Sequence, residues 1–141
     1  MKEKELIEKN KEYLNEYKEL CRKQTVYEEQ LKNYYETINA TRGIVITDMP
    51  RGRGKSDLSD YIVRLEELEN KILSMKESCC IRKLHIQESI GEMEEGIESL
   101  ILHLRYIKFM TWDSICEEIG YSNRQTHRLH LSGLRNFKIM S

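Results

Sequence analysis

The sequence has few residues that interrupt helices, and its cysteines are not spaced to form a disulfide or a metal site. Its 141 residues include one proline and seven glycines. The four cysteines form no CxxC pair, and the adjacent Cys79 and Cys80 are poor disulfide partners for each other. We therefore expect free thiols, a reducing compartment and a cytoplasmic protein.

Other absences exclude membrane and metal functions. No run of about eighteen apolar residues occurs, so we expect a soluble protein that does not enter the membrane. Residues 1–12 are mostly Lys and Glu and do not resemble a secretion signal. The four histidines and four cysteines lack the spacing of a zinc site. We expect no metal and no other cofactor.

The sequence offers no catalytic residue. Its many Glu side chains fall on the outer faces of amphipathic helices, and no Ser or Cys has the local context of a nucleophile. Gly54-Lys55-Ser56 matches the end of a phosphate-binding loop, but Met49 stands where that motif requires glycine. We expect the protein not to be an enzyme. A nucleotide-using enzyme built on residues 41–57 is an alternative that nucleotide binding would test.

The composition predicts an all-α fold, because charged residues make up 33% of the chain and Lys, Glu, Leu and Ile dominate. Residues 1–40 form the first predicted region, a heptad helix. Asn10 and Gln24 interrupt its seam, which is otherwise apolar or aromatic. The seam positions alternate by four and three residues and are 6, 10, 13, 17, 20, 24, 27, 31, 34 and 38. A coiled coil and a helical hairpin within one chain both fit this pattern.

Three further regions follow. Residues 41–57 hold the proline and three glycines, with Arg51, Arg53 and Lys55, and predict a basic loop. The spacing of apolar residues over 58–90 predicts a second long helix that can pack on the first. Residues 91–141 predict the DNA-binding domain, in which a third helix from about Glu92 to Ile107 precedes the final motif.

This motif is a helix-turn-helix between Thr111 and Phe137. Thr111 is suited to cap a first helix, Gly120 to form a tight turn, and Ser122 to cap a second helix. Tyr121 is the predicted apolar plug after the turn. The inward positions are Trp112, Ile115, Cys116 and Ile119 in the first helix and Thr126, Leu129, Gly133 and Phe137 in the second.

The outer face of the second helix is basic. Residues 91–122 carry two basic and seven acidic side chains, whereas residues 123–141 carry four basic and no acidic ones. Helix 123–137 therefore suits the major groove of double-stranded DNA. The predicted DNA-binding residues are Ser122, Asn123, Arg124, Gln125, His127, Arg128, Leu131, Arg135 and Lys138.

The expected contacts divide by chemistry. Either Arg124 or Arg128 would bind guanine, and the side-chain amide of either Asn123 or Gln125 would bind adenine. Arg135 and Lys138 would bind phosphates. Because one small helix binds weakly, we expect self-association through the N-terminal helices. The intrachain hairpin would compete for the same seam.

Several segments resemble region 4 of sigma-70-type factors and, more closely, the ArpU-like phage regulators. They are residues 104–107, 111–115, 120–122 and 126–130 with Leu134, and residues 49–57 also fit the phage proteins. Thr126 departs from the pattern, because region 4 usually carries a branched aliphatic residue there. Its hydroxyl is expected to bond a backbone carbonyl one turn back. The resemblance covers residues 41–137.

The resemblance implies a transcription regulator of phage or prophage genes, often late genes, with RNA polymerase as a candidate second partner. The sigma segments that melt DNA and bind the polymerase core have no counterpart here, so we do not expect a complete sigma factor. The alternative is a helical interaction module that binds RNA polymerase or another phage protein without reading DNA.

Overall fold

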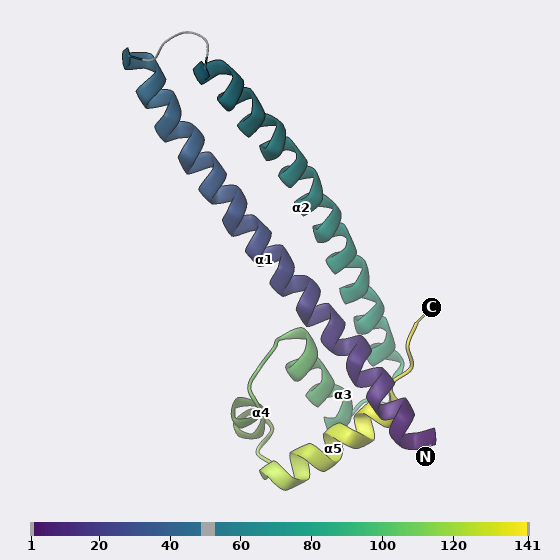
Figure 1. The fold of residues 1–141 in the computed structure, drawn as a ribbon. Coiled ribbons are helices and arrows are strands. Elements are labelled where there is room, and N and C mark those ends of the chain that lie inside the picture. The colour runs from purple at the N-terminus through teal and green to yellow at the C-terminus, as the bar shows by residue number, and fades with distance from the viewer. Residues whose placement is uncertain (1, 49–52, 141) are drawn as a thin grey trace. The chain divides into compact units, whose positions relative to one another are not determined.

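The computed structural model describes residues 2–48 and 53–140, with side chains for residues 2–40 and 58–140. Over these residues the fold contains helices and no strand, and the all-α prediction is confirmed (Figure 1). The elements are α1 (Lys2–Asp48), α2 (Arg53–Glu92), α3 (Ile97–Leu102), the π-helical turn η1 (His103–Ile107), α4 (Trp112–Ile119) and α5 (Asn123–Asn136).

The two long helices extend into the predicted loop. α1 continues to Asp48 and α2 begins at Arg53, so the loop prediction is wrong for residues 41–48 and 53–57. A single glycine such as Gly43 costs a helix only about 1 kcal/mol, which a long helix tolerates. Arg51 lies outside the described residues, as do the side chains of Arg53 and Lys55, and the role of this basic segment stays a prediction.

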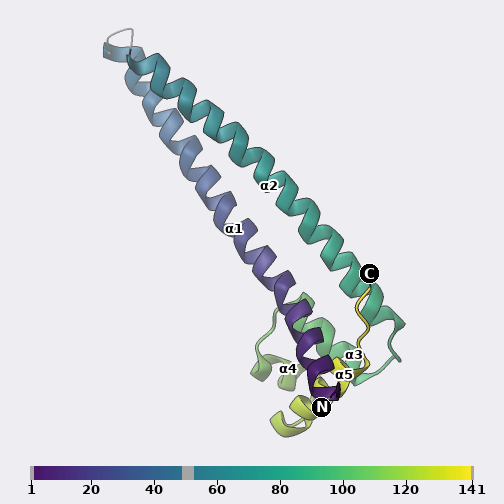
Figure 2. The same cartoon turned by 45° about the vertical axis from the view of Figure 1, so that its right-hand side comes forward.

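The chain divides into two compact units, and the first described here is Cys21–Ser78. In it, α1 and α2 run antiparallel (Figure 2). The rings of Tyr34 and Tyr61 meet edge to face, with their centroids 5.7 Å apart. The Lys71 ammonium lies 4.4 Å from the centre of the Tyr27 ring. The Tyr-rich seam of α1 thus packs on α2 of the same chain, which is the predicted hairpin arrangement.

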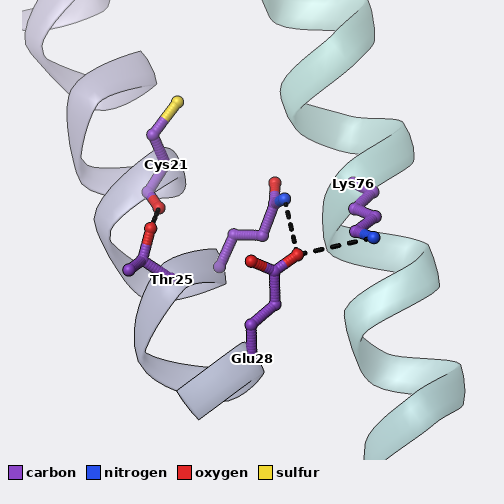
Figure 3. Close-up of polar contacts among 5 residues, drawn as sticks. Cys21, Thr25, Glu28 and Lys76 are labelled. Carbon is purple, nitrogen blue, oxygen red and sulfur yellow. Dashed lines mark hydrogen bonds and ion pairs between the residues drawn. The ribbon is translucent and has the colours of Figure 1, made fainter.

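The polar seam residue of this unit is accommodated by a small network (Figure 3). Gln24 Nε2 donates to Glu28 Oε1 at 3.2 Å, and the same oxygen pairs with Lys76 Nζ at 3.4 Å. Thr25 Oγ1 donates to the carbonyl of Cys21 at 3.0 Å within α1. The network gives the Gln24 amide a partner on a seam that is otherwise apolar or aromatic.

The other unit comprises Met1–Leu20 and Cys79–Ser141. Its three short helices gather around the N-terminal end of α1 (Figure 2). Leu14 of α1, Ile86 of α2 and Phe137 after α5 are almost fully buried. The Tyr17 ring stacks on Phe109 with centroids 5.6 Å apart. We call this unit the head, because it contains the helix-turn-helix.

Two local boundaries differ from the sequence predictions. α2 ends at Glu92, two residues beyond the predicted end at residue 90, so Gly91 lies in its last turn. The third helix begins at Ile97 rather than near Glu92, after a short bend that ends at Gly96, and it finishes as the π-helical turn. A Cβ at position 91 would meet nothing within 4 Å, so no contact requires glycine there.

Candidate nucleic-acid interface

The ends of α4 and α5 are fixed by local hydrogen bonds, as the sequence predicts. Thr111 Oγ1 accepts from the backbone N–H of Ser114, and Ser122 Oγ accepts from that of Gln125, each at 3.2 Å. Gly120 adopts φ +72°, the left-handed conformation in which a side chain is strained. These three residues set a turn of three residues between the two helices.

The inner faces of α4 and α5 form a packed core. Ile115 and Thr126 are fully buried, and Trp112 and Leu129 pack on the cluster of Ile101, Leu104 and Ile115. Gly133 allows α5 to lie close to α3, since a Cβ there would come within 3.3 Å of the Glu98 carbonyl oxygen. Tyr121 is exposed, so its predicted role as a plug is wrong.

Cys116 links the two helices near the start of α5. Its single S–H is shared between two acceptors, Asn123 Oδ1 at 3.0 Å and Thr126 Oγ1 at 3.3 Å. The hydroxyl of Thr126 therefore bonds the Cys116 thiol from α4, whereas the sequence suggests a carbonyl of its own helix. A small polar side chain at this buried position thus has a partner across the turn.

An aromatic and histidine cluster lies on the side of the head where α5 faces η1. The Trp112 ring centre is 4.6 Å from the ring centres of both His127 and His130, and the Arg105 guanidinium lies 4.7 Å over the same indole. Arg105 Nη1 also donates to the Met110 carbonyl at 2.9 Å. These contacts hold Arg105 in a single orientation.

The buried part of this cluster is uncharged at neutral pH. Burial lowers the pKa of His130 to about 4, and nearby basic groups act in the same direction. Burial raises the pKa of the Tyr106 hydroxyl to about 12. Tyr106 Oη lies 2.6 Å from His130 Nε2. We assign the phenol O–H as the donor, which places the proton of the neutral imidazole on Nδ1.

Most predicted DNA-binding side chains lie on one exposed surface of α5 and its N-cap. Arg124 and Arg128 are exposed and form no ion pair with any described residue. Leu131 is 48% exposed. The remaining exposed members of this set are Ser122, Asn123, Gln125 and His127. We call the surface formed by these seven residues the α5 face.

The C-terminal end of α5 is less free than the sequence suggests. Arg135 Nε pairs with Glu3 Oε1 of α1, although both side chains remain about half exposed. Asn10 Nδ2 donates to the carbonyls of Leu134 and Phe137 at 2.7 and 2.8 Å. The N-terminal part of α1 therefore holds this end of α5. Lys138 is exposed.

Sequence reasoning missed the contribution of α1 to this region. Lys11 and Asn15 lie one helical turn apart and line a pocket with Trp112 and His127. Asn10, which the sequence indicates as a polar interruption of the heptad seam, bonds the end of α5. A buried polar residue in a seam signals a specific partner, but the pattern does not say which one.

The described part of the chain lacks a metal-binding cluster, a disulfide and a membrane-spanning helix. No group of three or more His, Cys, Asp or Glu side chains that is suited to hold a metal occurs there. All four cysteines are free. None of the described helices has the length and apolar character needed to cross a membrane.

Comparison with known proteins gives one informative match. No known protein family matches the chain, and no solved structure matches it. A stretch of 72 residues is 33% identical to the RNA polymerase sigma-F factor of Bacillus subtilis (strain 168). The match covers 51% of this chain and 28% of the sigma factor. Over about half of its length the chain therefore resembles part of a bacterial sigma factor.

Proposed function

We propose that the protein is a sequence-specific regulator of transcription that binds double-stranded DNA through the α5 face. In this proposal α5 enters the major groove, and the genes regulated are phage or prophage genes, often late ones. The resemblance to ArpU-like regulators supports the phage role, and the similarity to a sigma factor supports a role in transcription.

The observation that carries the proposal is the exposed, unpaired state of two arginines on a helix held by a capped turn. Arg124 and Arg128 lie one turn apart on α5 and have no acidic partner among the described residues. A rigid cationic helix face of this kind suits the negative potential of a DNA groove. Guanine offers the O6 and N7 acceptors that one guanidinium binds with two hydrogen bonds.

The polar residues of the first turn of α5 supply the remaining base contacts. Asn123 Oδ1 already accepts from the Cys116 thiol, which leaves its two amide N–H groups for acceptors on a base. Gln125 is exposed, and its side-chain amide forms no hydrogen bond with the described residues. Gln125 is therefore the better candidate to bind adenine with both its oxygen and its nitrogen.

Arg135 and Lys138 have different roles in this proposal. Lys138 is exposed and available to a phosphate. Arg135 is paired with Glu3, so a phosphate contact requires it to leave or share that carboxylate. Because an exposed ion pair contributes only about 0–1 kcal/mol, this exchange costs little.

The test begins with selection of bound fragments from random DNA, which tests binding and specificity together. Arg128→Ala is then expected to weaken binding to the selected site by about 5- to 150-fold, the equivalent of about 1–3 kcal/mol for one base contact. Arg64→Ala, at an exposed position of α2, is the matched control and is expected to bind as the wild type does. Equal affinity of Arg128→Ala, with unchanged circular dichroism, would contradict the role of this arginine.

A second candidate is an interaction module that binds RNA polymerase or another phage protein. The similarity to an RNA polymerase sigma factor favours it, as does the exposure of single large apolar side chains in each unit, such as Leu73 at 67% and Leu84 at 54%. Salt separates the two candidates. Binding through DNA phosphates falls steeply as salt rises, whereas docking of an apolar surface does not.

A further inference from the structure

A pocket of about 300 Å³ opens beside the α5 face, within the head. Its lining includes Lys11 and Asn15 of α1, Arg105 and Trp112, and His127 and Leu131 of α5. Tyr106 and His130 complete the lining. The pocket thus brings Lys11, near the start of α1, next to α5, which lies more than a hundred positions later in the sequence.

The lining is basic and contains no carboxylate among the described residues. Lys11 and Arg105 are the basic side chains of the lining, and Lys11 forms no ion pair with any described residue. Arg105 uses one N–H for the Met110 carbonyl and is held over the indole, so its other N–H groups have a fixed direction. Glu8 acts on the Tyr106 hydroxyl but does not line the pocket.

The Trp112 indole in the pocket is already packed against three side chains of the head. Arg105 lies over the Trp112 indole, and the rings of His127 and His130 both have their centres 4.6 Å from its centre. A planar ligand would therefore compete with these three side chains for the indole. The groups that remain available are the Lys11 ammonium, guanidinium N–H groups and the Asn15 amide, which all donate to oxyanions.

The position of the pocket relates it to the α5 face. His127 follows Arg124 by three residues and Leu131 follows Arg128 by three, so the pocket borders the side of α5 that carries both arginines. A duplex whose groove receives that side places its sugar–phosphate backbone along the border.

We propose that this pocket binds a phosphate of the DNA backbone and that Lys11 supplies its main charge contact from α1. The proposal rests on the DNA-binding function proposed above. It makes α1 a part of the DNA-binding surface as well as a support for α5. The two cationic side chains and the exposed donors together favour an anionic backbone phosphate over an uncharged base.

The test compares Lys11→Gln, Lys11→Arg and the wild type, with Lys32→Gln on α1 as the matched control at an exposed position outside the head. Affinity for the selected duplex is measured by anisotropy as a function of salt. Loss of one phosphate contact is expected to lower the magnitude of the salt slope by about 0.9, which is about an 8-fold loss of affinity at 0.1 M salt. Lys11→Arg is expected to keep the wild-type slope.

The outcomes separate the two proposals. If the wild type binds DNA and Lys11→Gln keeps both its affinity and its salt slope, the pocket does not hold a phosphate, and the role of the α5 face is unaffected. If the wild type binds no duplex, both proposals fail. A loss in Lys11→Gln that appears equally in Lys32→Gln reflects net charge and also contradicts the pocket.

Discussion

Acid is expected to destabilise the head through one buried imidazole. His130 is 5% exposed, and its pKa of about 4 lies well below the ordinary value of 6.5. Between these two values the unfolded chain binds a proton at this residue and the folded chain does not. Its contribution to stability is therefore constant above pH 6.5, falls as the pH drops from 6.5 to 4, and is lost below 4.

The size of the effect follows from the difference in pKa. One pKa unit corresponds to about 1.4 kcal/mol, so the full interval lowers the free energy of unfolding by about 3 kcal/mol, of which about 2 kcal/mol is lost by pH 5. His130→Gln removes the titrating group and keeps an acceptor for the Tyr106 hydroxyl. Carboxylates titrate in both proteins, so their contribution to the pH dependence cancels when the stability of this variant is subtracted from that of the wild type.

The assay is chemical denaturation at pH 7, 6 and 5, followed by the fluorescence of Trp112. This is the only tryptophan of the chain, and its ring centre lies 4.6 Å from that of His130, so its signal reports the head. The wild type is expected to lose about 2 kcal/mol relative to His130→Gln between pH 7 and pH 5. A difference in stability that stays constant across this range would refute the argument.

Two further changes are expected to destabilise the head. Gly120→Val places a branched side chain at φ +72°, so it is expected to cost at least about 1–2 kcal/mol of stability and to lower the Tm. The control Gly91→Ala, inside α2, should be neutral or stabilising. An unchanged Tm for Gly120→Val would mean that the turn lies elsewhere. Asn10→Ala leaves the carbonyls of Leu134 and Phe137 without their donor and is expected to cost about 1–3 kcal/mol in chemical denaturation; wild-type stability would show that this amide does not hold α5.

The sequence predicts the helix-turn-helix well because its determinants are local. The caps at Thr111 and Ser122 and the left-handed Gly120 each depend on residues within one turn of the chain. The inward positions of α4 and α5 follow from helical periodicity, and Ile115 and Thr126 are buried as predicted. Local patterns therefore suffice to predict which side of α5 is buried, whereas the DNA-binding role of the α5 face stays a prediction.

The sequence does not predict which distant groups meet at the ends of α5. Counting charges over residues 123–141 finds no acid, yet Glu3 from α1 pairs with Arg135. The same limit applies to Lys11, which the heptad pattern places only on the outer side of α1. Such contacts depend on how helices pack, and periodicity within one helix carries no information about its partner.

The loop prediction failed for a related reason. Glycine and proline indicate breaks only on average, and tertiary packing along a long helix outweighs one glycine. α1 therefore runs through Gly43, and α2 contains Gly54 and Gly91. The bend that does occur, before α3, ends at Gly96.

The hydrogen bonds of Asn10 join residues separated by 124 and 127 positions, and one whole compact unit, Cys21–Ser78, lies between them in the sequence. During synthesis the first turns of α1 must therefore wait for their partners until residues 134–137 have left the ribosome. The antiparallel hairpin can form much earlier, since its contacts are closer in sequence. A nascent chain would thus acquire its hairpin first and its proposed DNA-binding surface last, and fragments released before that point would lack a closed head.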